Sequence, residues 1–510
     1  MKRHTLPFCS VVAAKILLGL LVISVSFSGT AFGVQALQTT SGVADDPIQT
    51  LAKKIEELNA TIQELRSEIS QSRQENREIR EELRRTRDAT VSINSNAGQK
   101  EQIATAEQLS QIEENQQLLA DKIDEQYQTK VESSSRYRMR LSGMVLFNTF
   151  ANRGRVDNQD VPNIALPRGP SDTGGDFGAT FRQSQLGFEV YGPQVGGARA
   201  SADLRLDFFG GFPTTANGTT AGLVRLRTAT MRFDWSRTSI VVGQDAPFLS
   251  PLSPSSVASV GYPEFSYSGN LWTWIPQARV EHRLNLSESH SISLQGGLMD
   301  PLVGDVPYSQ FYRTPQGGEK SRQPAYASRV AWIRGDSDQV LTMGIGGYYS
   351  RQNYGAGRTE DAWASTADWN VPFGNHFAFS GEFYRGRGLG GLGAAQDRSV
   401  VSKETDPLSP LIGLNVIGGW AQFKYKATST LEFNAAYGQD DPFSRDMRYS
   451  YETSNYLYPG TRKNQSSLFN MILRPRTDLL LSLEYRHLNT LTLSGRNTAN
   501  HLNLGVGVLF

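Results

Sequence analysis

The 510-residue chain is almost without cysteine. Its single cysteine, Cys9, precedes the first apolar run. One thiol cannot form a disulfide or a cysteine-based metal site within the chain. Histidine is scarce too, and the six histidines are scattered from His4 to His501 with no HExxH motif among them. Gly388, Gly390 and Gly393 match GxGxxG, but no helical pattern follows, so a dinucleotide fold is disfavoured. We therefore expect no enzyme activity, no metal and no cofactor.

Long apolar runs are also missing after Phe27. No later stretch approaches the ~20 apolar residues of a membrane helix. Mean hydropathy is negative, yet glycine and aromatic residues are abundant, with 48 Gly, 24 Phe, 19 Tyr and 7 Trp. Only helices and closed β-barrels satisfy the backbone within lipid. If the chain spans a membrane, it must do so as a barrel.

The N-terminus has the pattern of an export signal. Lys2, Arg3 and His4 give a positive start, residues 11–27 are apolar apart from Lys15, and Val34-Gln35-Ala36 offers a cleavage site. This order of charge, apolar run and small residues predicts a signal peptide over residues 1–36. The alternative is an N-terminal anchor helix, which the short, lysine-broken run disfavours.

Residues 48–86 follow a heptad pattern. Apolar residues alternate at spacings of three and four, and Glu, Lys, Arg, Gln and Asn lie between them. The pattern predicts a coiled coil, with Asn76 in the seam fixing its register. The seam has Ile at a and Leu at d, a combination that favours two strands, so the heptad alone does not predict a trimer. A weaker helical pattern and the linker Glu132–Ser135 complete a segment that we assign to residues 37–135.

The last residues, Leu502 to Phe510, alternate apolar with polar or small residues and end on an aromatic. A period of two indicates a strand. A terminal strand closing on Phe resembles the assembly signal of bacterial outer-membrane barrels. A soluble edge strand is the alternative.

The same alternation recurs from Tyr137 onward. We predict about sixteen antiparallel strands in an all-β transmembrane barrel over residues 136–510. The expected spans are 137–150, 180–191, 198–209, 223–235, 239–243, 274–283, 290–299, 323–334, 339–350, 358–370, 376–385, 414–426, 429–439, 463–474, 478–488 and 501–510. Connections are expected to alternate long and short throughout. An even strand number would leave both chain ends, and the coiled coil, in the periplasm.

Positive charge in the predicted barrel is almost all arginine. From Arg136 onward there are 31 Arg and 5 Lys against 31 Asp plus Glu. Arginines in a pore favour anions, although they also pair with acids of the wall and merely stiffen it. The expected pore-lining residues are Arg138, Arg140, Arg182, Arg199, Asp203, Arg205, Asp207, Arg279, Glu281, Arg329, Glu382, Glu484 and Arg486.

The segment Gln244–Thr273 follows the fifth predicted strand and is rich in proline and aromatic residues. Its two alternatives are a loop that folds into the lumen and narrows it, and an external loop packed on its neighbours or on another subunit.

Four stretches resemble the DcaP-like trimeric outer-membrane porins. They are Arg182–Phe188, Ala202–Gly210, Leu223–Arg227 and Val242–Gln244. The resemblance implies a sixteen-stranded trimer, a periplasmic coiled coil, a lumenal fifth-strand loop as in other sixteen-stranded porins, and uptake of small anionic solutes such as dicarboxylates. Gly381–Arg387 has no counterpart that we can place in that family.

Together these patterns predict a porin of the bacterial outer membrane, a homotrimer in contact with lipid that passes small hydrophilic, anionic solutes by diffusion and binds no nucleic acid. The alternatives are a sugar or general porin, a structural tether between outer membrane and periplasm, and an outer-membrane enzyme such as a lipid hydrolase.

Overall fold

The computed structural model describes residues 138–307, 312–335, 339–402, 408–448 and 460–510. The predicted signal peptide and coiled coil, together with their boundaries at residues 36 and 135, lie outside the described residues and stay predictions. Among the described residues no helix is long and apolar enough to cross a membrane.

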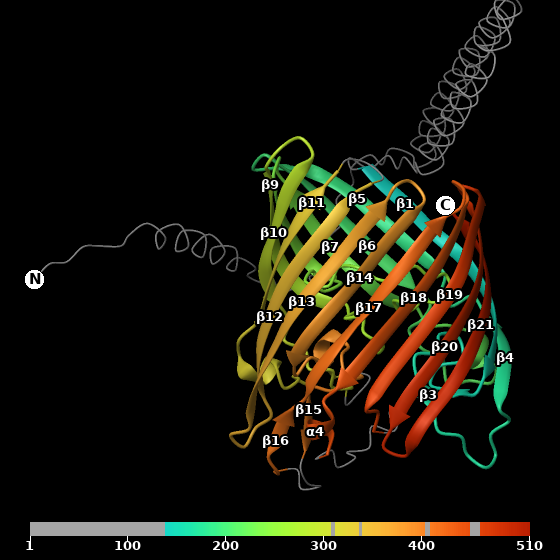
Figure 1. Ribbon diagram of the computed structural model, residues 1–510. Helices are drawn as coiled ribbons and strands as arrows, with labels where there is room; N and C mark the ends of the chain where they lie inside the picture. Colours follow the sequence, from blue (N-terminus) through green and yellow to red (C-terminus); the bar gives the residue numbers. More distant parts are fainter. Residues whose placement is uncertain (1–137, 308–311, 336–338, 403–407, 449–459) are drawn as a thin grey trace, which may run out of the picture. The chain divides into compact units, whose positions relative to one another are not determined.

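The described chain forms a closed antiparallel barrel (Figure 1). Seventeen strands share one sheet, and β4 and β5 both pair with β1 at successive stretches of its length, so together they fill one position and the barrel has sixteen. Pairing of β1 with β21, from Met144↔Leu509 to Arg153↔Asn500, closes the circle. The strands are β1 (Arg138–Arg153), β4 (Gly175–Thr180), β5 (Gln185–Val195), β6 (Ala198–Asp207), β7 (Arg225–Asp234), β8 (Thr238–Asp245), β9 (Ile275–Asn285), β10 (His290–Met299), β11 (Ala325–Arg334), β12 (Leu341–Asn353), β13 (Thr359–Phe373), β14 (Phe377–Arg387), β17 (Asn415–Lys426), β18 (Leu431–Pro442), β19 (Lys463–Arg476), β20 (Leu479–Thr492) and β21 (Gly495–Leu509).

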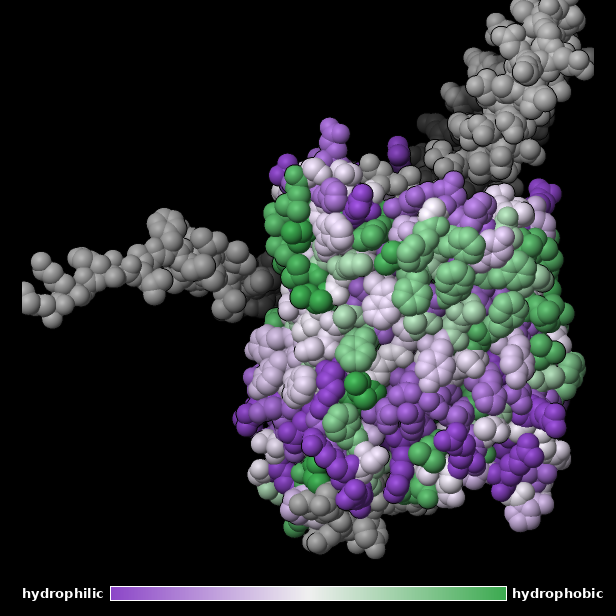
Figure 2. Space-filling view, in the orientation of Figure 1, coloured by the Kyte–Doolittle hydropathy of each residue, from purple (hydrophilic) through white to green (hydrophobic). Residues whose placement is uncertain are grey.

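Side chains alternate between the two faces of the wall, as the period of two predicts. On β20, Leu483 and Tyr485 are almost half exposed, whereas Glu484 and Arg486 between them are buried inside the barrel. Figure 2 shows the outcome on one side of the molecule, where apolar residues form a band around the half of the barrel that carries the C-terminus. A barrel with an apolar outer band and a polar interior is the transmembrane pattern.

The two ends of the barrel differ. Arg138 and Phe510 lie at one end, where the connections are tight, and we call this the turn end. The opposite, loop end carries most of the long connections. Two connections at the loop end are short, however, Tyr354–Arg358 and Leu493–Ser494. The expectation of long and short connections throughout was therefore wrong at these two places.

Loops at the loop end pack into the mouth of the barrel. Leu302, Leu389 and Leu392 join wall residues such as Tyr348 and Tyr384 in the largest apolar cluster. Small elements punctuate these loops: β2 (Arg155–Val156), β3 (Ala165–Leu166), η1 (Gly218–Thr220), η2 (Glu319–Ser321), η3 (Gly390–Leu392), β15 (Val400–Ser402), β16 (Leu411–Gly413) and α4 (Ser444–Met447). The mouth is thus partly filled on the side of β9 to β18.

Candidate functional site

The connection between β8 and β9, residues 246–274, runs inside the barrel, and we call it the lumenal loop. Its apolar residues Leu249, Phe265 and Leu271 are 0%, 2% and 1% exposed. The expectation of a loop folded into the lumen is confirmed, and the external alternative is wrong. The polar wall explains this placement, because buried backbone groups of the loop need hydrogen-bond partners, and wall side chains supply them.

The first part of the lumenal loop is attached to β13, β14 and β17. The carboxylate of Glu382 accepts hydrogen bonds from the hydroxyl of Ser250 at 2.5 Å and from the backbone N–H of Leu252 at 2.6 Å. The hydroxyl of Thr366 donates to the carbonyl of Leu249 at 2.7 Å. These bonds hold the loop against one wall of the barrel.

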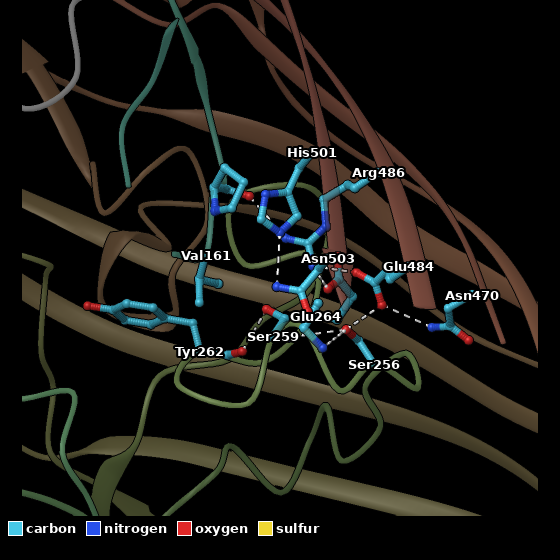
Figure 3. A network of polar contacts seen from close by, with 12 residues as sticks. Val161, Ser256, Ser259, Tyr262, Glu264, Asn470, Glu484, Arg486, His501 and Asn503 are labelled. Atoms are coloured by element: carbon cyan, nitrogen blue, oxygen red, sulfur yellow. Dashed lines mark hydrogen bonds and ion pairs between the residues drawn. The ribbon is translucent and has the colours of Figure 1, made fainter. Parts of the chain in front are cut away.

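A buried charged cluster attaches the middle of the loop to β20 (Figure 3). The Arg486 guanidinium donates to Glu264 of the loop, to Glu484 at 2.8 Å and to the carbonyl of Pro162 at 3.0 Å. Glu484 also accepts from the hydroxyl of Ser256 at 2.6 Å. Arg486, Glu264 and Glu484 are each 1% exposed, so this cluster is shielded from solvent.

Two amides hold the rest of the loop. Gln183, in the break between β4 and β5, accepts from the backbone N–H groups of Val260 and Gly261 at 2.7 and 2.8 Å. Asn464 of β19 donates to the carbonyl of Tyr267 at 3.0 Å. At Gly269 the loop backbone lies so close to the wall that a Cβ on this residue would be 2.2 Å from the carbonyl oxygen of Gly419. The φ of Gly269, +102°, also favours glycine.

The lumenal loop therefore follows the wall formed by β13, β14, β17, β19 and β20. The opposite wall, β6 to β9, carries seven inward-facing arginines and five carboxylates, and we call it the arginine wall. The arginines are Arg199, Arg205, Arg225, Arg227, Arg232, Arg279 and Arg283, and the acids are Asp203, Asp207, Asp234, Asp245 and Glu281. The wall across the lumen from most of the loop's attachments thus carries more arginines than carboxylates.

Loop and arginine wall meet at arginine–aromatic contacts. The Arg225 guanidinium lies 5.1 Å from the ring centroid of Tyr262 and 5.0 Å from that of Trp274, and Arg227 lies 5.0 Å from Trp274. Asp207 holds both arginines, at 2.7 Å and 3.6 Å. A register shift between β6 and β7 lets both arginines face inward. Cation–π contacts and one shared carboxylate fix these guanidiniums in place.

A cavity of 680 Å³ opens beside this contact, between residues 154–174 and 208–224. Arg182 lines it, with its guanidinium carbon 4.0 Å from the ring centroids of both Phe209 and Phe212. Asp160 pairs with Arg182 at 2.8 Å. The cavity continues the arginine–aromatic lining toward the loop end.

Of the thirteen residues expected to line the pore, twelve lie on inward-facing positions of strands. Arg182 instead lies in the break before β5. Exposed or partly exposed to the lumen are Arg138, Arg140, Arg199, Asp203, Arg205, Arg279 and Glu281. Buried against other groups are Arg182, Asp207, Arg329, Glu382, Glu484 and Arg486. Contact with a solute stays a prediction for all thirteen.

The buried members have other roles in the described structure. Glu382, Glu484 and Arg486 hold the lumenal loop, as shown above, whereas Arg329 pairs with Asp368 of β13 at 2.6 Å and stiffens the wall. For Arg329, Glu484 and Arg486 the alternative of arginine–acid pairing describes the contacts better than an open lining does, whereas Glu382 bonds to the loop without an arginine.

Sequence reasoning missed Arg225, Arg227, Glu264 and Gln183. In the predicted strand 223–235 neither face is uniformly apolar. The cause is the register shift, which turns both Arg225 and Arg227 inward. A bulge of this kind breaks the period of two, which is the signal that could have found them. Glu264 and Gln183 lie outside regular strands, where no period assigns a face.

No family model and no curated protein matches the sequence. Among solved structures, the outer membrane channel DcaP of Acinetobacter baumannii has a TM-score of 0.56 at 16% identity, covering 75% of this chain and 100% of its own. This chain has the fold of that channel. Two further matches score lower, the anion-selective porin from Comamonas acidovorans (TM-score 0.44, 12% identity, 74% and 100% coverage) and Pseudomonas putida OprB (0.45, 10%, 73% and 94%). Their TM-scores lie below 0.5, and at 16% identity the first match establishes the fold alone.

Proposed function

We propose that the protein is a diffusion channel of the bacterial outer membrane, working as a homotrimer, that favours small anionic solutes with carboxylate groups. The turn end would face the periplasm and the loop end the exterior, as the even strand number and the loop lengths suggest. One observation carries the preference for anions: the lumenal loop is attached to one wall of the barrel, and the wall across the lumen carries seven inward-facing arginines. A solute would then pass between the loop and this arginine wall.

The charges of this passage support a modest preference. Seven arginines oppose five carboxylates on β6 to β9. Among the arginines of this wall that form ion pairs, Arg205 is the most exposed, with a side chain 60% exposed although it bonds to Asp203 at 3.1 Å. Guanidinium presents a planar fork of donors that matches a carboxylate. Because most of these arginines already have acidic partners, the net positive potential of the wall is weak, and the preference for anions should be modest.

The test is the reversal potential of the purified protein in a planar bilayer under a salt gradient. We expect anion preference, and we expect Arg205→Gln with Arg227→Gln to move the potential toward cations. The shift should be larger in dilute salt, because the Debye length is about 10 Å at 0.1 M but about 3 Å at 1 M. This pair of substitutions removes the contact of Arg227 with Trp274 but leaves Arg225 bonded to Asp207 and to the carbonyl of Gly261 in the lumenal loop.

The matched control removes two arginines that face outward, Arg351→Gln with Arg496→Gln, and it should leave the potential unchanged. A cation-selective unmutated channel would make a sugar or general porin the better assignment. A protein with no steady current would instead favour the structural tether.

A further inference from the structure

The outer wall near the loop end is polar where the turn end is apolar. Figure 2 shows this boundary, with hydrophilic residues covering the half of the visible face nearer the loop end. On β20 and β21 the outward row changes from the paired, half-exposed residues Leu483 and Leu504 to the paired His487 and Asn500. Outward charged or amide groups are unfavourable against hydrocarbon. This outer surface therefore faces something other than acyl chains.

Many of these outward polar groups bond to one another across strands. The Gln465 amide donates to the Tyr437 hydroxyl at 2.7 Å and to the Gln439 amide oxygen at 2.9 Å. Lys463 donates to Asp441 at 2.9 Å, and Gln439 donates to the same carboxylate at 3.2 Å. Such a layer is compatible with a hydrated, hydroxyl-rich neighbour, because its groups are satisfied and still partly exposed.

Arg385 departs from this pattern of internal pairing. It faces outward on β14, in register with Ile417. Among the described residues its side chain forms no ion pair, and its hydrogen bonds go to neutral acceptors, including the amide oxygen of Asn415 at 3.1 Å and the carbonyl of Val416 at 3.3 Å. Its guanidinium carbon lies 4.4 Å from the ring centroid of Phe443. An outward guanidinium is thus fixed in position without a carboxylate.

A second arginine shares the same ring. Arg445 lies 5.4 Å from the centroid of Phe443, and its side chain is 68% exposed. Its one carboxylate partner in the described chain, Asp446 at 3.3 Å, also accepts two hydrogen bonds from Asn415 at 3.0 and 2.9 Å. Two guanidiniums contact one ring, and within the described chain only Arg445 pairs with a carboxylate, so the patch is net positive and rich in donors.

We propose that Arg385 and Arg445 bind a phosphate on the saccharide headgroup of an outer-leaflet glycolipid. Guanidinium binds phosphate with paired hydrogen bonds, and the adjoining amides of β18 to β20 suit sugar hydroxyls. On β14 Arg385 follows the outward-facing, exposed Phe379 and Phe383, so the patch lies outside the lumen where this apolar row ends. Headgroups would begin at that level. This inference depends on the outer-membrane location proposed above, but not on conductance or ion selectivity.

The experiment measures binding of purified lipopolysaccharide to the detergent-solubilised full-length protein. We expect Arg385→Gln with Arg445→Gln to weaken binding at least five-fold, and dephosphorylated lipopolysaccharide to bind the unmutated protein equally weakly. Arg351→Gln is the matched control, because Arg351 also faces outward but already pairs with Asp361 at 3.5 Å. Heat-modifiable migration shows that each variant is folded, and the exposed single variant Arg445→Gln serves if the double variant does not fold.

Three results would overturn the proposal. The first is equal binding of lipopolysaccharide by the double variant. The second is displacement of bound lipopolysaccharide from the unmutated protein by millimolar inorganic phosphate, which would indicate a site for free anions. The third is a changed oligomeric state with unchanged lipopolysaccharide affinity, which would assign the patch to a contact with a second copy. Currents recorded from the same samples keep this test separate from that of the channel function.

Discussion

Removing Arg486 should weaken the attachment of the lumenal loop more than removing its partner Glu264. The guanidinium lies between Glu264 of the loop and Glu484 of β20, all three 1% exposed. Arg486→Gln would leave two buried carboxylates without a cation. Glu264→Gln would leave one buried ion pair, Arg486 with Glu484, intact. The two substitutions therefore break the same contact with unequal cost.

The magnitudes follow from burial. Breaking a buried pair so that a charge stays uncompensated costs about 3–5 kcal/mol. Replacing one partner by a neutral group that can still bond costs about the value of one charged hydrogen bond, roughly 1.5–3 kcal/mol. A substitution that costs about 3 kcal/mol lowers the ratio of attached to released loop by a factor of about 100. Because the loop occupies part of the lumen, its release should widen the passage.

The assay is single-channel conductance together with urea unfolding of the refolded barrel. Arg486→Gln should raise the conductance, increase its fluctuations and lower the unfolding midpoint, whereas Glu264→Gln should do each to a smaller extent. Arg474→Gln is the control, since its ion pair with Glu432 is 3.4 Å long and its side chain is 45% exposed. Such pairs are worth about 0–1 kcal/mol. If Arg486→Gln behaved like this control, or if Glu264→Gln were the more damaging, the role given to the cluster would be wrong.

Two further outcomes can be measured. Burial raises the pKa of Asp397, which accepts a hydrogen bond from Tyr267 of the lumenal loop, from 3.8 to about 7. Between pH ~4 and ~7 the folded state then keeps a proton that the unfolded state has lost, so stability should fall as the pH rises through this window, and Asp397→Asn should flatten the fall in unfolding midpoints between pH 5 and pH 8. Phe510→Ala should reduce the amount of barrel in the outer membrane without changing single-channel conductance, because Phe510 exchanges backbone hydrogen bonds of 2.8 and 3.1 Å with Gly143 and its side chain is 44% exposed, away from the lumen. Membrane fractionation tests this, and normal abundance of the variant would contradict it.

Strand number and facing could be predicted because each rests on local alternation. Every one of the sixteen expected spans overlaps a strand, or the pair β4 and β5, of the structure. Errors concentrate where alternation fails. The terminal strand was expected from His501 but begins at Gly495, since its first residues are polar on both faces and lie beyond the apolar band. The break at Phe181–Ser184 was not expected, because its residues still look like part of a strand.

The contacts of the site were beyond sequence reasoning. Glu382 and Glu484 could be placed on the inner face, but whether they meet water, an arginine or a loop depends on residues more than 100 positions away, such as Ser250 and Ser256. A period of two assigns a face and carries no information on pairing across the lumen. Because the lumenal loop folds against the wall, Glu382 and Glu484 bind the loop instead of lining an open pore.

Different strands of the barrel hold the lumenal loop and carry the arginine wall. Residues that hold the lumenal loop, Arg486 and Glu382 among them, belong to β14 and β20, whereas the arginine wall belongs to β6 to β9. Substitutions at attachment points should alter conductance first, by changing the width of the passage, and substitutions on the arginine wall should alter ion preference first, by changing its charge. The two are joined by hydrogen bonds at Arg225, which bonds to Asp207 on its own wall and to the carbonyl of Gly261 in the loop at 2.5 Å. A change there should therefore move both properties together.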